Sequence, residues 1–388
     1  MVFGLGRTSP RVTAPLSFAT VANVRTIAPE ERERLIAAPG FGTVFTDHMV
    51  TIKWTGDHGW HDPQVRPREP FTLDPATMVL HYAQTIFEGL KAYPAEDNLV
   101  TLFRPGENAR RFNASARRLA MPELPEHLFI AAIEHLVRAD ADWMPSGGGS
   151  LYLRPFMFAD ETFLGVRPAH SYVFCVIASP AGSYFKGGEC PITVWVSDRY
   201  SRAAVGGTGA AKCGGNYAGS LAAQAEASLH GCDQVVFLDA AHHRWVEELG
   251  GMNIFFVMSD GSIVTPPLGT ILPGITRASI ISLARADGML IEEKRYAADE
   301  WERDAANGRL REVFVCGTAA TIVPVGKVCS RAGKCLIGAG EAGPVTRDLR
   351  HRLLAIQRGE AEDRFGWRHP IQLESPQEAR AERAGRCE

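Results

Sequence analysis

Hydrophobic and polar residues alternate along the first part of the chain in patterns that predict both strands and helices. Residues 48–56 alternate like a half-buried strand, and residues 151–155 begin another. Between them, apolar residues recur at helical spacing within 107–119 and 127–144, which predicts two helices. We interpret the short run of serine and glycine at 146–150 as a loop within one domain, because a predicted strand follows it at once.

A second block rich in strand patterns begins near Pro191. Strands are predicted at 192–197, 235–238, 244–248, 253–258, 262–265 and 312–316. One helix is expected from Asn216 to about His230, with Gly231 suited to its C-terminal cap, and another after Pro273-Gly274. The pattern predicts an α/β (α+β) protein of two domains with their boundary near 185–195.

The ends of the chain differ in character from its middle. Residues 1–40 are expected to form a partly disordered leader, and residues 369–388 a polar, mobile tail. Between them we expect a small α/β domain at 41–184, an interdomain loop at 185–200 and a large domain at 201–368.

Composition excludes several classes of partner. The 388 residues are 45% hydrophobic and 22% charged with a net charge of −3, so nucleic acid is not an expected partner. No run of about 18 apolar residues exists, which argues against a membrane span. The eight cysteines contain no C-x-x-C pair, as in reduced cytoplasmic enzymes, and no H-E-x-x-H or other metal motif is present.

The densest glycine cluster, residues 206–216, surrounds Lys212. A phosphate-binding P-loop is excluded, because Lys212 is preceded by Ala211 and followed by Cys213. What remains is a lysine among small residues just before a helix, where a carbonyl compound could reach its amine and form a Schiff base. Taken alone, a surface loop lysine is the more common explanation.

Neighbouring segments change that balance. Glu248 closes an apolar strand, and a buried carboxylate there needs a cation, either a protonated pyridine nitrogen or an Arg or Lys side chain. The helix start at 272–277 and the turn at 317–321 could each cradle a phosphate, although most helix starts bind only water. Arg104 is a second candidate phosphate ligand or an ordinary exposed arginine.

The run from Glu248 to Arg277 resembles the signature of the fold-type IV pyridoxal-phosphate enzymes. Further segments resemble the branched-chain amino acid aminotransferases in their actinobacterial form. The resemblance extends over roughly residues 40–368. The segments that carry it are 45–49, 80–84, 87–93, 152–154, 184–188 and 212–217. The resemblance implies a smaller N-terminal α/β domain and a larger C-terminal domain with a barrel-like sheet. It also implies pyridoxal 5′-phosphate as cofactor, a cytoplasmic homodimer with shared active sites, and amino acids and 2-oxo acids as substrates.

The resemblance also assigns roles to individual residues. The resemblance implies that Lys212 holds the cofactor as an imine and moves the proton. It implies that Glu248 contacts the pyridine nitrogen and that Tyr217 contacts the ring oxygen. The implied phosphate ligands are Arg104, Ile275, Thr276 and Thr318, and the implied pocket walls are Phe45, Phe87, Tyr152, Tyr184 and Gly251. Residues that family members contribute to the active site of the neighbouring subunit are matched by Tyr82, Leu164 and Val166. Arg154 matches an arginine that admits the second carboxylate of glutamate. The backbone groups of Thr318-Ala319 match those that bind the α-carboxylate.

These expectations lead to a reversible branched-chain transaminase acting on L-leucine, L-isoleucine, L-valine and 2-oxoglutarate with ping-pong kinetics. Two alternatives stay open. Another reaction on the same fold, by a D-amino acid transaminase or an aminodeoxychorismate-type lyase, uses the same lysine and glutamate. A non-catalytic phosphate-binding module would keep only the glycine-rich loops.

Overall fold

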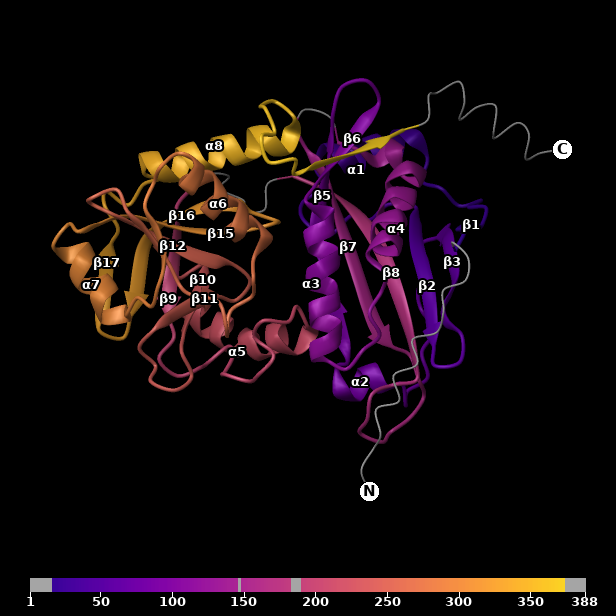
Figure 1. Cartoon of the computed structure of the whole chain (residues 1–388), viewed down its shortest axis with the longest axis horizontal. Coiled ribbons are helices and arrows are strands. Elements are labelled where there is room, and N and C mark those ends of the chain that lie inside the picture. The colour runs from indigo at the N-terminus through magenta and orange to yellow at the C-terminus, as the bar shows by residue number, and fades with distance from the viewer. Residues whose placement is uncertain (1–15, 146–147, 183–189, 374–388) are drawn as a thin grey trace.

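The computed structural model describes residues 16–145, 148–182 and 190–373. Figure 1 shows two lobes side by side, each built around its own sheet, with α3 (Pro105–Arg118) standing along the seam between them. In the described part of the chain each sheet has nine strands. The functional residues predicted from the sequence come from both lobes, so the seam is where they can meet.

The first sheet is antiparallel except at one edge, and its path runs β1-β3-β2-β8-β7-β5-β6-β18, with β4 paired to β7. Its strands are β1 (Ala19–Thr20), β2 (His48–Thr55), β3 (Gly59–Pro67), β4 (Thr85–Phe87), β5 (Leu90–Pro94), β6 (Leu99–Phe103), β7 (Ser150–Ala159), β8 (Ser171–Ala181) and β18 (Arg368–Gln372). The other helices of this lobe are α1 (Pro29–Ala37), α2 (Met78–Tyr82) and α4 (Glu126–Ala139), with a 3₁₀ turn at Ala141–Trp143.

The core of this lobe forms where α4 covers β2 and β8. The rings of Phe112, Phe129 and Phe174 meet there at centroid distances of 5.4–5.9 Å, and all three side chains are buried. The apolar positions of the predicted helices point into this cluster, which is why helical spacing was visible in the sequence.

The second sheet is mixed, with the path β11-β10-β9-β16-β15-β12-β13-β14 and β17 paired to β16. Its strands are β9 (Ile192–Val196), β10 (Gln234–Leu238), β11 (Val246–Leu249), β12 (Asn253–Met258), β13 (Ile263–Thr265), β14 (Ile291–Glu293), β15 (Leu310–Gly317), β16 (Thr321–Ser330) and β17 (Gly333–Leu336). Its helices are α5 (Gly214–Leu229), α6 (Ile275–Ala286), α7 (Ala298–Ala306) and α8 (Pro344–Arg358). In Figure 1, α8 lies across the top of this lobe, and the chain then returns to the first lobe as β18.

The predicted strands and helices recur in the structure, but two of the predicted boundaries do not hold. Within the expected interdomain loop at 185–200, Ile192–Val196 forms β9, a central strand. The expected tail at 369–388 begins inside β18, whose backbone pairs with β6; the rest of the tail, from 374, lies outside the described residues. The leader at 1–40, which was expected to be only partly disordered, contains β1 and α1. Pairing with distant strands, which local polarity does not reveal, orders these segments.

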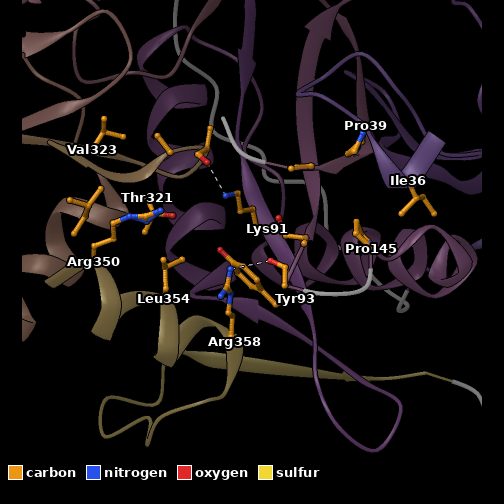
Figure 2. Close-up of a pocket in the computed structure, with 18 of the residues that line it drawn as sticks. Ile36, Pro39, Lys91, Tyr93, Pro145, Thr321, Val323, Arg350, Leu354 and Arg358 are labelled. Atoms are coloured by element: carbon orange, nitrogen blue, oxygen red, sulfur yellow. Dashed lines mark hydrogen bonds between the residues drawn. The ribbon is translucent and has the colours of Figure 1, made fainter. Parts of the chain in front are cut away.

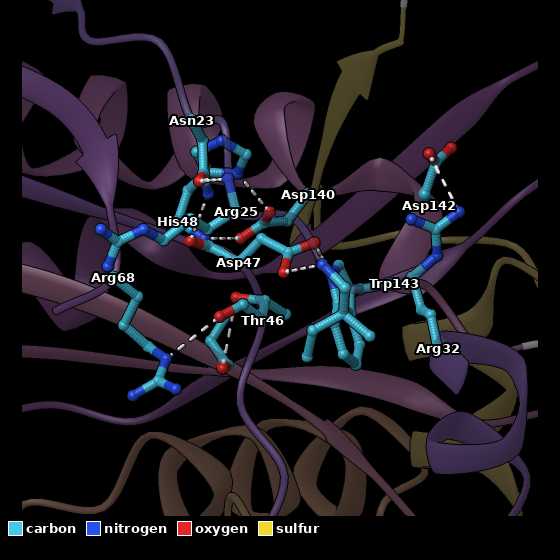
Figure 3. A network of polar contacts seen from close by, with 12 residues as sticks. Asn23, Arg25, Arg32, Thr46, Asp47, His48, Arg68, Asp140, Asp142 and Trp143 are labelled. Atoms are coloured by element: carbon cyan, nitrogen blue, oxygen red, sulfur yellow. Dashed lines mark hydrogen bonds and ion pairs between the residues drawn. The ribbon is translucent and has the colours of Figure 1, made fainter. Parts of the chain in front are cut away.

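A polar network fixes the leader against the first sheet (Figure 3). The Asp47 carboxylate accepts the Ile27 N–H at 3.0 Å and the Trp143 indole N–H at 2.8 Å, and Asn23 donates to the Asp47 carbonyl at 3.0 Å. Next to it, His48 Nδ1 lies 2.7 Å from Asp140 Oδ1.

Among the described helices, none combines the length and apolar character that a membrane crossing needs.

We expect the His48–Asp140 pair to make stability depend on pH. Burial alone lowers the pKa of His48, but the Asp140 carboxylate outweighs it and the net shift is upward. A raised pKa means that the pair stabilises the fold fully below the ordinary histidine pKa of about 6.5. That stability is lost as pH rises through the higher pKa of the folded state. Urea denaturation between pH 5.5 and 8.5 should show this decline, and His48→Gln or Asp140→Asn should remove it; an unchanged slope in both variants contradicts the assignment.

Candidate active site

The first lobe holds the backbone of Lys212 on both sides. Its N–H donates to Ser115 Oγ of α3 at 2.9 Å, and its carbonyl accepts the Phe87 N–H at 3.0 Å. The loop before it passes so close to Thr270 that any side chain at Gly209 would overlap the Thr270 carbonyl, which explains the need for glycine there. Lys212 belongs to the second lobe by sequence, yet its position is set by the first.

The Lys212 amine lies among aromatic groups at the seam. Nζ donates a hydrogen bond to Tyr217 Oη at 2.7 Å, because Tyr217 lies in the first turn of α5, directly after the lysine. Nζ is also 4.7 Å from the centroid of the Phe87 ring, which packs against the Tyr217 ring at 4.9 Å. The structure therefore brings two of the residues singled out in the sequence, Lys212 and Tyr217, into direct contact, and a hydroxyl is in reach to exchange a proton with the amine.

Glu248 lies at the inner end of β11 and is buried. Oε1 accepts the Leu272 N–H at 2.9 Å and faces Arg202 Nη1 at 2.8 Å, while Oε2 accepts Asn253 Nδ2 at 3.0 Å. Burial raises the pKa of Glu248 to about 7, an effect that the charge of Arg202 opposes only in part. A carboxylate offers about four lone-pair sites, so one acceptor position on Oε2 is left for a further donor.

Arg104 and the start of α6 lie together at the seam. Arg104 Nη1 donates to Ser279 Oγ of α6 at 2.8 Å, and its guanidinium stacks over the Trp367 ring at 5.1 Å. Among the described residues, no side chain caps the N-terminus of α6, which begins at Ile275 and includes Thr276 in its first turn. This combination of free helix N–H groups and an arginine suits a phosphate.

The turn between β15 and β16 lies next to Tyr217 and Gly251. Gly317 opens this turn, and a side-chain carbon at Gly317 would lie 3.5 Å from the Gly251 carbonyl oxygen. A side-chain carbon at Gly251 would in turn lie 3.6 Å from the Tyr217 ring. Thr318 and Ala319 form the turn itself. On its far side, Lys91 Nζ donates to the Ala319 carbonyl at 2.8 Å.

Only part of the predicted substrate pocket comes together around Lys212. Arg154 lies 4.9 Å from the Phe87 ring, and its Nη2 donates to Tyr152 Oη at 3.2 Å, so these three form one wall. The ring of Phe45 lies 5.3 Å from the guanidinium of Arg68. Tyr184 lies outside the described residues.

Tyr82, Leu164 and Val166 form a separate exposed group. Tyr82 Oη donates to the Leu164 carbonyl, and the side chains of Leu164 and Val166 are 61% and 85% exposed. Within the single chain, no described contact joins these residues to Lys212. Exposed apolar side chains that lie close together, as those of Tyr82 and Leu164 do, can form a surface that a second chain covers.

Sequence reasoning missed a buried ion pair beneath the site. Arg111 of α3 binds both oxygens of Glu88, at 2.7 and 2.8 Å, and Asn108 donates to Glu88 Oε2 at 2.8 Å. Arg111 also donates to the Pro273 carbonyl in the other lobe at 3.1 Å. The one signal in the sequence was an arginine on the apolar face of a predicted helix, between Ala109 and Phe112.

Arg202 and Ser115 were missed as well, because neither belongs to a recognisable motif. Arg202 is the cation on Glu248, so the salt bridge considered as an alternative from the sequence does exist. This salt bridge leaves one hydrogen-bond acceptor position on Glu248 unused. Glu248 can therefore pair with Arg202 and also accept a hydrogen bond from a protonated pyridine nitrogen, so the two interpretations from the sequence are compatible. In the described part of the chain, no group of three or more His, Cys, Asp or Glu side chains could hold a metal ion.

Comparison with known proteins shows which family this chain resembles. The family model for amino-transferase class IV matches residues 85–328. A probable branched-chain-amino-acid aminotransferase of Streptomyces coelicolor is 57% identical over 348 residues, covering 89% of this chain and 96% of its own. The branched-chain-amino-acid aminotransferase of Mycolicibacterium smegmatis is 53% identical over 361 residues, covering 92% and 98%.

Solved structures give the same result. The branched-chain amino acid aminotransferase of Escherichia coli superposes with a TM-score of 0.68 at 30% identity, covering 82% of this chain and 98% of its own. The T.th. branched-chain amino acid aminotransferase, solved with pyridoxamine 5′-phosphate, has a TM-score of 0.67 at 29% identity, covering 82% and 97%.

We expect the Glu88–Arg111 pair to be essential for folding. Arg111→Met leaves an unpaired buried carboxylate, which should lower the free energy of unfolding by about 3–5 kcal/mol. Glu88→Gln combined with Arg111→Met removes both charges and should restore part of that loss. Chemical denaturation followed by circular dichroism measures both variants, with Arg347→Met, an exposed arginine on α8, as control. Equal stability of Arg111→Met and the parent protein contradicts this role.

Proposed function

The chain belongs to the class IV aminotransferases, and among them to the branched-chain aminotransferases, and we propose that it moves amino groups between branched-chain amino acids and 2-oxoglutarate. Membership of this family confirms the predicted fold-type IV class and the assignment as an aminotransferase. The substrates of the proposed reaction are L-leucine, L-isoleucine and L-valine. The proposed kinetics are ping-pong, with the first oxo acid leaving before the second binds.

One observation carries the proposal. The Lys212 amine, which is hydrogen-bonded to the Tyr217 hydroxyl, lies at the same seam as the buried Glu248, and Glu248 has one hydrogen-bond acceptor position unused. The relative solved with pyridoxamine 5′-phosphate adds support for pyridoxal 5′-phosphate as the cofactor. A non-catalytic phosphate module has no need to bury a carboxylate of raised pKa beside a lysine, so this alternative is disfavoured.

The residues present fit each part of pyridoxal phosphate. Lys212 would hold its aldehyde carbon, the acceptor position of Glu248 its ring nitrogen, and Tyr217 its ring oxygen. Arg104 with the N-terminal N–H groups of Ile275 and Thr276 would hold its phosphate, and Thr318 would add a further contact. When bound, the cofactor supplies an electron sink and stores the amino group between the two half-reactions.

The side chains of this protein supply the proton transfers and the orientation. The free Lys212 amine would take the Cα proton of the substrate, and the Tyr217 hydroxyl 2.7 Å away would steady the amine in the position from which it acts. Glu248 would hold a proton at the ring nitrogen of the cofactor, because its buried carboxylate favours a cation there. The backbone N–H groups of Thr318 and Ala319 hold the α-carboxylate, which fixes the direction of the Cα–H bond.

The pocket walls explain the proposed specificity. Phe87 and Tyr152 offer an apolar surface for branched side chains, to which we add Phe45, Tyr184 and Gly251 from the family pattern. Arg154 lies between Phe87 and Tyr152, and its Nε–H is buried without an acceptor among the described residues, so it can receive the second carboxylate of 2-oxoglutarate.

We place the active enzyme in a homodimer, in which Tyr82, Leu164 and Val166 of one subunit complete the site of the other. Their exposure in the single chain supports this arrangement. The cysteines of the described part are all free, which supports a reducing compartment, the cytoplasm.

The direct test is the first half-reaction. The purified holoenzyme should show a visible absorption band that is lost on addition of L-leucine and returns with 2-oxoglutarate. D-alanine and aminodeoxychorismate should have no comparable effect. Lys212→Ala should lower the turnover rate by at least about 10⁴-fold, since the removed amine serves both as the attachment point of the cofactor and as the base. The variant should still bind the phosphate group of the cofactor, because other residues make those contacts. Conversion of D-alanine in preference to L-leucine identifies the other transaminase of this fold and overturns the proposal.

A second prediction isolates the role of Glu248. Glu248→Gln should lower kcat for L-leucine by about 10²–10³-fold, because an uncharged amide no longer favours a cation at the ring nitrogen. Glu247→Gln is the matched control, since the neighbouring carboxylate on β11 bonds to Thr270 instead. A near-parental rate in Glu248→Gln, or an equal loss in both variants, removes Glu248 from the mechanism.

A further inference from the structure

A cavity of about 550 Å³ lies in the second lobe, beside the start of β11. Its walls are the segments 204–205, 239–242, 245–247 and 266–271, together with Arg295. None of Lys212, Glu248 and Arg104 lines it, and it has no lining residue in common with the cavity of Figure 2, which lies between β5 and α8. The described residues therefore form a space that is separate from the site around Lys212 and large enough for a small metabolite.

Glu247 of β11 faces this cavity. Successive side chains of a strand point to opposite sides, so Glu247 points away from its neighbour Glu248, which belongs to the proposed catalytic side. Glu247 is only 8% exposed. Its Oε1 accepts a hydrogen bond from the Thr270 hydroxyl, and its Oε2 has no hydrogen-bond partner among the described residues. One oxygen of a nearly buried carboxylate is thus left for a ligand that lies in the cavity.

The surroundings of Glu247 disfavour its negative charge. Burial raises the pKa of its carboxyl group and the Asp239 carboxylate raises it further, while the Thr270 hydroxyl and the charge of Arg202 compensate only in part. Asp239 is itself occupied, because its two oxygens accept backbone N–H groups of its own turn. An ammonium group at Glu247 Oε2 would supply a cation that the buried carboxylate lacks.

Arg295 brings a positive charge to the same cavity. Its side chain is exposed, and its guanidinium lies 5.8 Å from the centroid of the Trp245 ring, which also lines the cavity. Within the described ranges, Arg295 has no ion-pair partner. The other arginine at this ring, Arg244, is paired with Asp299 and does not line the cavity. A guanidinium that lacks a carboxylate therefore borders the same space as a carboxylate that lacks a cation.

Much of the remaining wall is apolar. Leu268 and Val205 line the cavity and are 52% and 95% exposed. Pro266, Pro267 and Ile271 lie in the same wall as Leu268. An apolar side chain of a ligand that covers these residues would remove their surface from water, which favours binding.

We propose that the cavity beside β11 is a second binding site, for a free α-amino acid with an apolar side chain. The ammonium group of this ligand pairs with Glu247 Oε2, its carboxylate pairs with the guanidinium of Arg295, and its side chain packs against Leu268. An amine without a carboxylate leaves Arg295 unpaired, and a carboxylic acid without an amine leaves Glu247 unpaired. Both charged groups of the ligand are therefore needed.

The cavity and the catalytic side share two structural elements. Strand β11 carries Glu247 on one face and Glu248 on the other, and the loop that holds Thr270 continues to Leu272, whose N–H binds Glu248 at 2.9 Å. A ligand that contacts both Glu247 and this loop holds the two elements in the position in which they support Glu248. Because the ligand binds only the folded chain, its binding also adds to the stability of the fold.

The test measures binding to the holoenzyme after sodium borohydride has fixed the cofactor on Lys212, so that no turnover takes place. L-leucine is titrated calorimetrically and compared with 3-methylbutylamine and 4-methylpentanoate, each of which lacks one of its two charged groups. We expect L-leucine to bind at least about tenfold more tightly than either analogue, because each analogue leaves one charged group of the cavity without its partner. Binding of either analogue as tightly as L-leucine, or no binding of L-leucine, overturns the proposal.

Variants separate this cavity from the catalytic site, where L-leucine can also bind. Glu247→Gln and Arg295→Gln should each weaken the binding of L-leucine by at least about tenfold. Arg347→Gln, which removes an exposed arginine of α8 outside the cavity, should bind L-leucine like the parent protein. Leu268→Trp, which fills the cavity, is the further variant if Glu247→Gln does not fold, and it should also weaken binding. Binding that any of these cavity variants leaves unchanged contradicts the proposal.

This site does not depend on the proposed function, because neither Glu247 nor Arg295 takes part in it. If L-leucine does not change the absorption of the untreated holoenzyme, the proposed function fails, but binding that requires Glu247 and Arg295 still supports the second site. If L-leucine is converted but its binding to the reduced enzyme does not require these two residues, only the second site fails. The two failures are therefore distinguishable.

Discussion

The buried ion pair between Glu88 and Arg111 is the contact on which the arrangement of the seam depends. Two charges without access to water are tolerated only when each satisfies the other, and here the arginine binds both oxygens of the acid. Glu88 follows Phe87, whose N–H holds the Lys212 carbonyl, and Arg111 reaches the Pro273 carbonyl just before α6. One pair thus links the strand beside the lysine, the helix at the seam and the loop that leads to the start of α6, the proposed phosphate site.

Helix α3 extends this link along its length. Arg104 stands immediately before the helix, and Asn108, Arg111 and Ser115, which are spaced by three and four residues, share one of its faces. In order, they contact Ser279 of α6, Glu88, Pro273 and the Lys212 backbone. The two lobes are therefore positioned by polar contacts from a single rigid element, and a site built on such an element holds its geometry better than one built on loops.

This arrangement explains which features the sequence could predict. Lys212 and Glu248 stand in local patterns, a glycine-rich segment and the end of an apolar strand, and their neighbours along the chain were enough to single them out. Arg111, Ser115 and Arg202 owe their roles to partners in distant segments, which no local pattern records. The same reason applies to β9 and β18, where pairing with remote strands decides the structure of segments that look like a loop and a tail.

Glu88 and Glu248, two of the buried glutamates, show how the same burial can serve opposite purposes. Glu88 is bound through both oxygens by Arg111 and also by Asn108, and its pKa is lowered even though burial raises it. Glu248 faces its arginine through one oxygen only, and its pKa remains raised, at about 7. The charge of Lys212 lowers the pKa of both acids. Glu88 is therefore fully compensated and acts as a fixed structural charge, whereas Glu248 still gains from a second cation. An enzyme that must hold a protonated ring nitrogen needs an acid of the second kind, supported by a framework built on one of the first.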